Sequence, residues 1–150
     1  METLITLLGT FSISLIIQKS YLKEYRFALA GRIAMSTMLV LTATGHFLFT
    51  KGMAMMIPFL PFATEIVYVT GLIELIAAIG LLLPKYKKVI GWFLILFFIL
   101  LLPANIYAAS SHIDIQNATY NGEGLDYLWF RIPLQLVIIV WVYWSAVRKS

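Results

Sequence analysis

The sequence predicts an all-α membrane protein, with five transmembrane helices in a single domain that covers residues 1–150. Three observations predict this fold class. Hydrophobic residues make up 61% of the chain and charged residues only 12%, about half the charged share of a soluble domain. Five apolar stretches are long enough to cross a bilayer. Basic residues gather in alternate linkers. Together these observations exclude a soluble globule, a disordered chain and a nucleic-acid-binding module.

The five stretches were identified as apolar runs of about 20 residues, the length that crosses the hydrocarbon core. They cover residues 3–18, 27–49, 63–83, 89–109 and 128–146. The first is the shortest, and a four-span alternative would lay residues 1–18 on the membrane surface. We expect a retained helix there, because Glu2 stands where a signal peptide has basic residues and no cleavage site follows.

Basic residues predict the orientation of these spans. One side of the membrane receives eight of them: Lys19, Lys23, Arg26, Lys85, Lys87, Lys88, Arg148 and Lys149. The other side receives only Lys51, and the polar outer loop 110–127 has none. The positive-inside rule therefore predicts an outside N-terminus and a cytoplasmic C-terminus.

Polar side chains inside the spans are candidate sites, because burying them in hydrocarbon costs several kcal/mol. The candidate ligand-binding residues are His46, Thr70, Glu74, Asn105, Arg131 and Gln135. From a helical rise of about 1.5 Å per residue, His46, Asn105, Arg131 and Gln135 are expected at one outer level, with Glu74 nearer mid-membrane.

Local spacing supports part of this cluster. Thr70, Gly71 and Glu74 share a helix face, so small residues flank the carboxylate where another helix could approach. Pro103 interrupts the fourth span and is expected to turn Asn105 inward.

Glu74 has two interpretations at this point. It forms a structural ion pair with Arg32 or Arg131, which fixes the helix register. Alternatively, it binds a ligand or handles protons. Arg32 is close enough to the cytoplasmic side that we expect its side chain to snorkel toward water. No metal site is expected, because the chain has no cysteine and only two histidines.

Several motifs, in order, resemble the DoxX-like family of small bacterial membrane proteins over about residues 27–146. They are Gly45-His46-Phe47, Met56-Ile57-Pro58 with Pro61, Thr70-Gly71-Leu72-Ile73-Glu74-Leu75, Gly80-Leu81-Leu82-Leu83-Pro84, Leu102-Pro103-Ala104-Asn105-Ile106-Tyr107 and Tyr127-Leu128-Trp129-Phe130-Arg131-Ile132-Pro133-Leu134-Gln135. The resemblance implies a four-helix transmembrane bundle in a bacterial cytoplasmic membrane, with the first span as an addition. Arg32 and Glu74 match by position. The family includes subunits of redox complexes, but a chain without cysteine does not support transfer of their sulfur chemistry.

Two functions follow as expectations. The first is an accessory or assembly subunit of a membrane complex, of respiratory or redox type. Such a subunit would have no complete catalytic set and no cofactor of its own, and its partner would be a membrane protein or a second copy. The alternative is a quinone- or lipid-binding protein with an outer-half polar pocket centred on Glu74. The sequence leaves open whether the protein is an enzyme.

Overall fold

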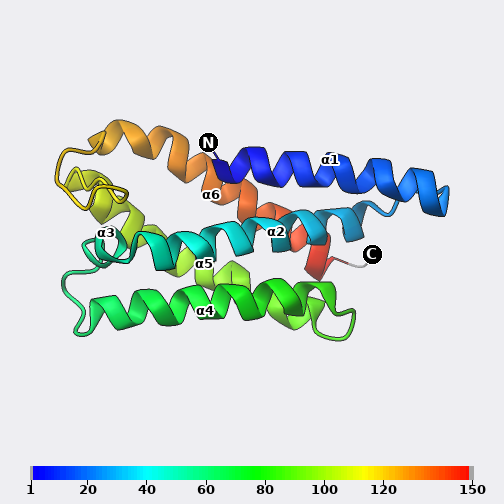
Figure 1. Cartoon of the computed structure of the whole chain (residues 1–150), viewed down its shortest axis with the longest axis horizontal. Coiled ribbons are helices and arrows are strands. Elements are labelled where there is room, and N and C mark those ends of the chain that lie inside the picture. The colour runs from blue at the N-terminus through cyan, green and yellow to red at the C-terminus, as the bar shows by residue number, and fades with distance from the viewer. Residues whose placement is uncertain (1, 149–150) are drawn as a thin grey trace.

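The computed structural model describes residues 2–148, and this part of the chain is helical, with no strand. The structure has five long helices in this part of the chain, and they lie side by side (Figure 1). They are α1 (Glu2–Leu22), α2 (Phe27–Leu48), α4 (Ala63–Leu82), α5 (Lys87–Ser110) and α6 (Leu128–Val142). Three short elements join or extend them: α3 (Thr50–Ala54), the 3-10 helix η1 (Gly124–Tyr127) and the π-helix η2 (Tyr143–Val147).

Each of the five long helices is long and apolar enough to cross a membrane, with α6 counted together with η1 and η2. The prediction of five candidate spans is therefore confirmed. The bounds differ at α1, which continues past residue 18 to Leu22. Apolarity stops there before helical structure does, because Lys19, Ser20 and Tyr21 are compatible with a helix although they are polar.

The bundle has two chemically different ends. The α1–α2 turn, the α4–α5 turn and the end of η2 lie together at the end that we call the basic end (Figure 1). Seven of the eight residues predicted to be cytoplasmic lie in these segments or within a helical turn of them, and Lys149 lies outside the described residues. The opposite end, which we call the loop end, carries α3 and residues 111–123. The basic residues that alternate between linkers in the sequence therefore gather at one end of the bundle.

α2 is the central helix. Its most extensive contacts are with α4 and then with α1, and it also contacts α6 and η2. Gly31 of α2 allows η2 to approach closely, since a Cβ placed there would lie 2.9 Å from Cβ of Ser145. Trp141 Nε1 donates a hydrogen bond of 3.0 Å to the Gly31 carbonyl at the same contact. Small residues at helix crossings are the usual means of close packing in membranes.

α1 packs on this bundle through one stripe of side chains. Leu7, Ser14 and Gln18 are buried, and Phe11 meets Trp141 edge to face with ring centroids 5.1 Å apart. These residues are spaced by three or four positions, so they share one helix face. α1 begins near the middle of the bundle's length and extends past the other helices at the basic end (Figure 1). It is thus a peripheral helix attached along one side.

The loop end is folded against α3. The backbone of Gly52 in α3 lies so close to the Ile115 carbonyl that a side chain at position 52 would collide with it. The Asp114 carboxylate accepts hydrogen bonds from the backbone of Gln116 and from both the backbone and the side chain of Asn117. These bonds, led by the Asn117 side chain, hold the pKa of Asp114 below its usual value. Residues 111–119 therefore form a structured turn.

Candidate functional site

A histidine–carboxylate pair joins the two helices that pack most extensively. His46 Nε2 in the last turn of α2 lies 3.5 Å from Glu74 Oε2 in α4. The His46 side chain is 12% exposed and the Glu74 side chain 3%. The pair is therefore almost entirely enclosed between helices, with its accessible edge on the histidine.

Further hydrogen bonds complete what we call the α2–α4 network, made of Thr42, His46, Val67, Thr70 and Glu74. Thr42 Oγ1 lies 3.0 Å from Glu74 Oε2 and 3.1 Å from the Leu39 carbonyl, so its hydroxyl can donate to either oxygen. Thr70 Oγ1 donates to the Val67 carbonyl at 2.9 Å and lies 3.1 Å from His46 Nδ1.

The network fixes where the imidazole hydrogen must be. His46 Nδ1 lies 3.1 Å from the Val67 carbonyl oxygen, which can only accept, so Nδ1 carries a hydrogen and donates it. Nε2 is then the nitrogen that faces Oε2 of Glu74, and a proton held between these two atoms would make the pair neutral overall.

Helical spacing explains why these residues meet. Thr42 and His46 are four residues apart on α2, and Thr70 and Glu74 are four apart on α4. Gly71 lets the helices approach, because a Cβ there would lie 2.8 Å from Cβ of His46. The expectation that small residues beside Glu74 admit another helix is confirmed, and that helix is α2. Sequence reasoning missed Thr42, although its position one turn before His46 could have indicated it.

The arginines expected to pair with Glu74 do not do so. Among residues 2–148 the ion pairs are His46–Glu74 and Arg26–Glu24, so neither Arg32 nor Arg131 joins the carboxylate. Arg32 is ten residues before Thr42 on α2, which places it about 15 Å away along the helix axis. Arg32 is 8% exposed, with Nε and Nη1 enclosed, so most of its side chain is packed inside the bundle and does not extend into water.

The remaining candidates form a second polar group, on α5 and α6. Gln135 is 3% exposed, and its Nε2 donates to the Phe98 carbonyl at 2.8 Å. Asn105 is buried, as expected for a residue just after Pro103, but its Nδ2 has no acceptor within residues 2–148. Arg131 Nε is likewise buried without a partner there. We call Asn105, Arg131 and Gln135 the α5–α6 group.

The predicted outer cluster is thus divided. His46, Thr70 and Glu74 are brought together by α2 and α4, whereas the α5–α6 group is held by the other helix pair. No hydrogen bond or ion pair within residues 2–148 connects the two sets. That part of the chain also contains no group of three histidine, cysteine or acidic side chains arranged to hold a metal ion.

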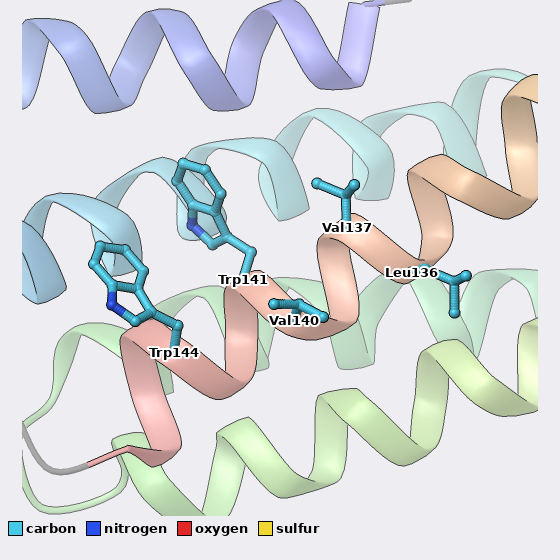
Figure 2. Close-up of a pocket in the computed structure, with 5 residues that line it drawn as sticks. All are labelled: Leu136, Val137, Val140, Trp141 and Trp144. Carbon is cyan, nitrogen blue, oxygen red and sulfur yellow. The ribbon is translucent and has the colours of Figure 1, made fainter.

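A shallow groove runs along α6 and η2 beside α1 (Figure 2). Its lining residues are Leu136, Val137, Val140, Trp141 and Trp144. Figure 2 shows both tryptophan rings directed toward α1, with the valines continuing the groove along α6. The lining is apolar and offers no group for acid–base or metal chemistry, so this groove is a surface suited to apolar chains.

Comparisons with known proteins place most of the chain in one family. A family model described as a domain of unknown function (DUF8561) matches residues 35–146, about three quarters of the chain. The match begins within α2, so α1 lies outside it. No curated protein and no solved structure matches the chain.

Proposed function

We propose that this chain, which belongs to the DUF8561 family, acts as an accessory or assembly subunit of a membrane complex. Respiratory and redox complexes are the first class to test, because the chain resembles the DoxX-like family, which includes subunits of such complexes. We place it in a bacterial cytoplasmic membrane, with the basic end toward the cytoplasm. Its partner is a membrane protein or a second copy of the chain.

The observation that carries this proposal is the closure of the α2–α4 network. His46, Glu74 and their threonine neighbours satisfy one another, so the network connects two helices and leaves no reactive group aimed at a substrate. Buried polar groups that are fully paired fix the register of helices. The chain also contains no cysteine for redox or acyl chemistry. These features favour a scaffold over a catalyst.

The loop end supplies a surface for such a partner. Residues 111–119 are structured and rest on α3, and large apolar side chains surround them: Leu48, Phe59, Phe62, Tyr120, Leu125 and Trp129 are each more than half exposed. Aromatic side chains at the edge of a membrane domain serve both headgroup anchoring and protein contacts. A partner that reaches the outer face would meet this rim.

The proposal is tested by deleting the chain from its native cell and separating the solubilised membrane complexes on blue-native gels. We expect at least one complex to lose mass or abundance, and wild-type chain to restore it. Quantitative proteomics of the shifted band then identifies the subunits that depend on this chain. An unchanged set of membrane complexes in the deletion strain would contradict the proposal.

A second candidate function is favoured by a specific observation on α5 and α6. Asn105 Nδ2 and Arg131 Nε are hydrogen-bond donors that are buried without an acceptor in residues 2–148. Quinone carbonyls and lipid headgroups are acceptors that such donors would bind. In this alternative the chain binds a quinone or lipid in the outer half of the membrane, at the α5–α6 group.

The two functions are separated by variants of the unpartnered donors. Asn105→Ala and Arg131→Gln remove a donor each and leave the α2–α4 network intact. If the chain is an accessory subunit, either variant still restores the membrane complex that is lost in the deletion strain. A quinone- or lipid-binding protein instead loses a bound mass in native mass spectrometry, while its elution profile in detergent shows that it folds.

A further inference from the structure

Arg32 is a buried cation without a partner in the protein. It lies in the second turn of α2, at the basic end, and is 8% exposed. Its Nε and Nη1 atoms are enclosed and have no acceptor within residues 2–148. The third nitrogen, Nη2, makes no hydrogen bond there either and is not among the enclosed atoms, so it reaches the molecular surface. The guanidinium is therefore buried on one edge and accessible on the other.

The position of Arg32 follows from α2 packing on α4. One turn further along α2, the Ser36 hydroxyl donates to the Ala78 carbonyl of α4 at 2.8 Å. The helices run in opposite directions, so Arg32 lies level with the last turn of α4, which ends at Leu82. The negative end of that helix dipole favours a cation, but it provides no hydrogen bond to Nε or Nη1.

A guanidinium in this state requires an anion. Burying a charge without a partner costs several kcal/mol, and donors left without acceptors add to that cost. The planar fork of an arginine matches two oxygens of a carboxylate or a phosphate. The basic end offers no free carboxylate: Glu24 is the only acidic side chain there in the described residues, and it pairs with Arg26 at 2.6 Å.

The charge of the basic end favours an external anion. Seven basic residues surround this end and make its potential positive.

We propose that Arg32 binds the phosphate group of an anionic ligand at the basic end, with the accessible Nη2 side of its guanidinium donating to the phosphate oxygens. The phosphate belongs to an anionic membrane lipid or to a free phosphate ion. A lipid fits the location, because the last turn of α4 and the start of α2 lie where headgroups meet the hydrocarbon core, and the cytoplasmic leaflet is anionic. This site is independent of the proposed accessory function.

The test uses the full-length chain, purified in detergent and depleted of phospholipid. Native mass spectrometry measures binding of dioleoylphosphatidylglycerol, of dioleoylphosphatidylcholine with the same acyl chains, and of inorganic phosphate. Arg32→Gln is the test variant. Arg148→Gln is the matched control, because it removes one exposed positive charge from the same end.

We expect the wild-type chain to bind one phosphatidylglycerol in preference to phosphatidylcholine. Arg32→Gln should weaken this binding about tenfold or more, as expected for loss of a charge-assisted pair of hydrogen bonds. Arg148→Gln should stay within about twofold, since exposed charges contribute little. If inorganic phosphate competes with phosphatidylglycerol, the site binds phosphate from either source. If phosphatidylglycerol binds and inorganic phosphate does not, the site is specific for lipid.

Equal binding of phosphatidylglycerol by the wild-type chain and Arg32→Gln would overturn the proposal, as would equal losses in both variants. Thermal unfolding supplies a second readout. Phosphatidylglycerol should raise the unfolding midpoint of the wild-type chain but not that of Arg32→Gln. If Arg32→Gln does not fold, Arg32→Lys replaces it as the test variant, because lysine keeps the positive charge but lacks the planar guanidinium fork. Unchanged affinity in Arg32→Lys would also overturn the proposal.

Discussion

Nε2 of His46 lies 3.5 Å from Oε2 of Glu74, and this contact joins the end of α2 to the middle of α4. Because the Val67 carbonyl accepts a hydrogen bond from Nδ1 of the same imidazole, Nε2 is the nitrogen left to face the carboxylate. The polar side chains of two helices are thereby paired with each other.

Glu74→Gln should be tolerated better than Glu74→Ala. A glutamine Nε2 in place of Oε2 can donate to His46 Nε2 and to Thr42 Oγ1, whose hydroxyl then donates to the Leu39 carbonyl. We expect a loss of unfolding free energy of about 1 kcal/mol or less for Gln, and about 2–4 kcal/mol for Ala, which also leaves a cavity. Thermal unfolding in detergent, followed by tryptophan fluorescence, measures both losses.

Glu65→Gln is the control, because Glu65 is exposed on the same helix. Equal effects of the Gln and Ala variants at position 74 would contradict the hydrogen-bond assignment.

Gly71→Ala should destabilise the bundle although alanine favours helices. The added Cβ would lie 2.8 Å from Cβ of His46 and 3.3 Å from the Phe47 ring. Separating α2 from α4 should cost about 1–3 kcal/mol. Gly9→Ala is the matched control, because nothing lies within 4 Å of the added Cβ, and it should stabilise the chain by up to about 1 kcal/mol. A higher unfolding midpoint for Gly71→Ala than for wild type would show that the α2–α4 contact is not as close as described.

The structured turn at residues 111–119 should loosen in acid. The pKa of Asp114 is lowered in the folded chain by its bonds to Asn117 and Gln116, so the ionised form stabilises the turn. That stabilisation is complete above the unfolded-state pKa of about 3.9 and is lost as the pH falls through the lower folded-state pKa. Hydrogen exchange of the Asn117 amide, corrected for intrinsic rates, should therefore speed up below about pH 4. Asp114→Asn should remove this dependence, and an unchanged profile in that variant would refute the assignment.

α1 should detach when its buried stripe is weakened. Leu7 is fully buried against the bundle, whereas Leu8 beside it is 48% exposed. Leu7→Ala should increase the mobility of α1, and Leu8→Ala should not. Since the chain has no native cysteine to remove, a single spin-labelled cysteine in place of Ser12 reports that mobility. Equal spectra for the two variants would mean that the stripe does not hold α1.

Sequence reasoning predicted the helices well and the pairing of their faces poorly. Twenty-residue apolar runs are a direct consequence of bilayer thickness, so the bounds of α2 and α4 came within one residue. The partner of Glu74 could not be found in the same way. A span that is apolar on all sides does not indicate which face meets which neighbour. The sequence pattern offered two arginines for Glu74, whereas packing at Gly71 placed His46 beside it.

The α5–α6 group shows the same limit. Pro103 correctly predicted a buried Asn105, because a proline changes the backbone locally. Whether Asn105, Arg131 and Gln135 lie near His46 depends on the rotation of two helices about their axes, which no local pattern records. The depth estimate from helical rise therefore placed residues at one level and could not place them in one cluster.

The pairing of His46 with Glu74 also bears on how the chain enters its membrane. α2 and α4 are separated by only fourteen residues, 49–62, so they are synthesised in quick succession and can meet as a helical hairpin. Alone, each helix would carry an unpaired polar side chain into hydrocarbon. As a hairpin the two helices enter with these side chains already paired, which lowers the cost of insertion before α5 and α6 are made.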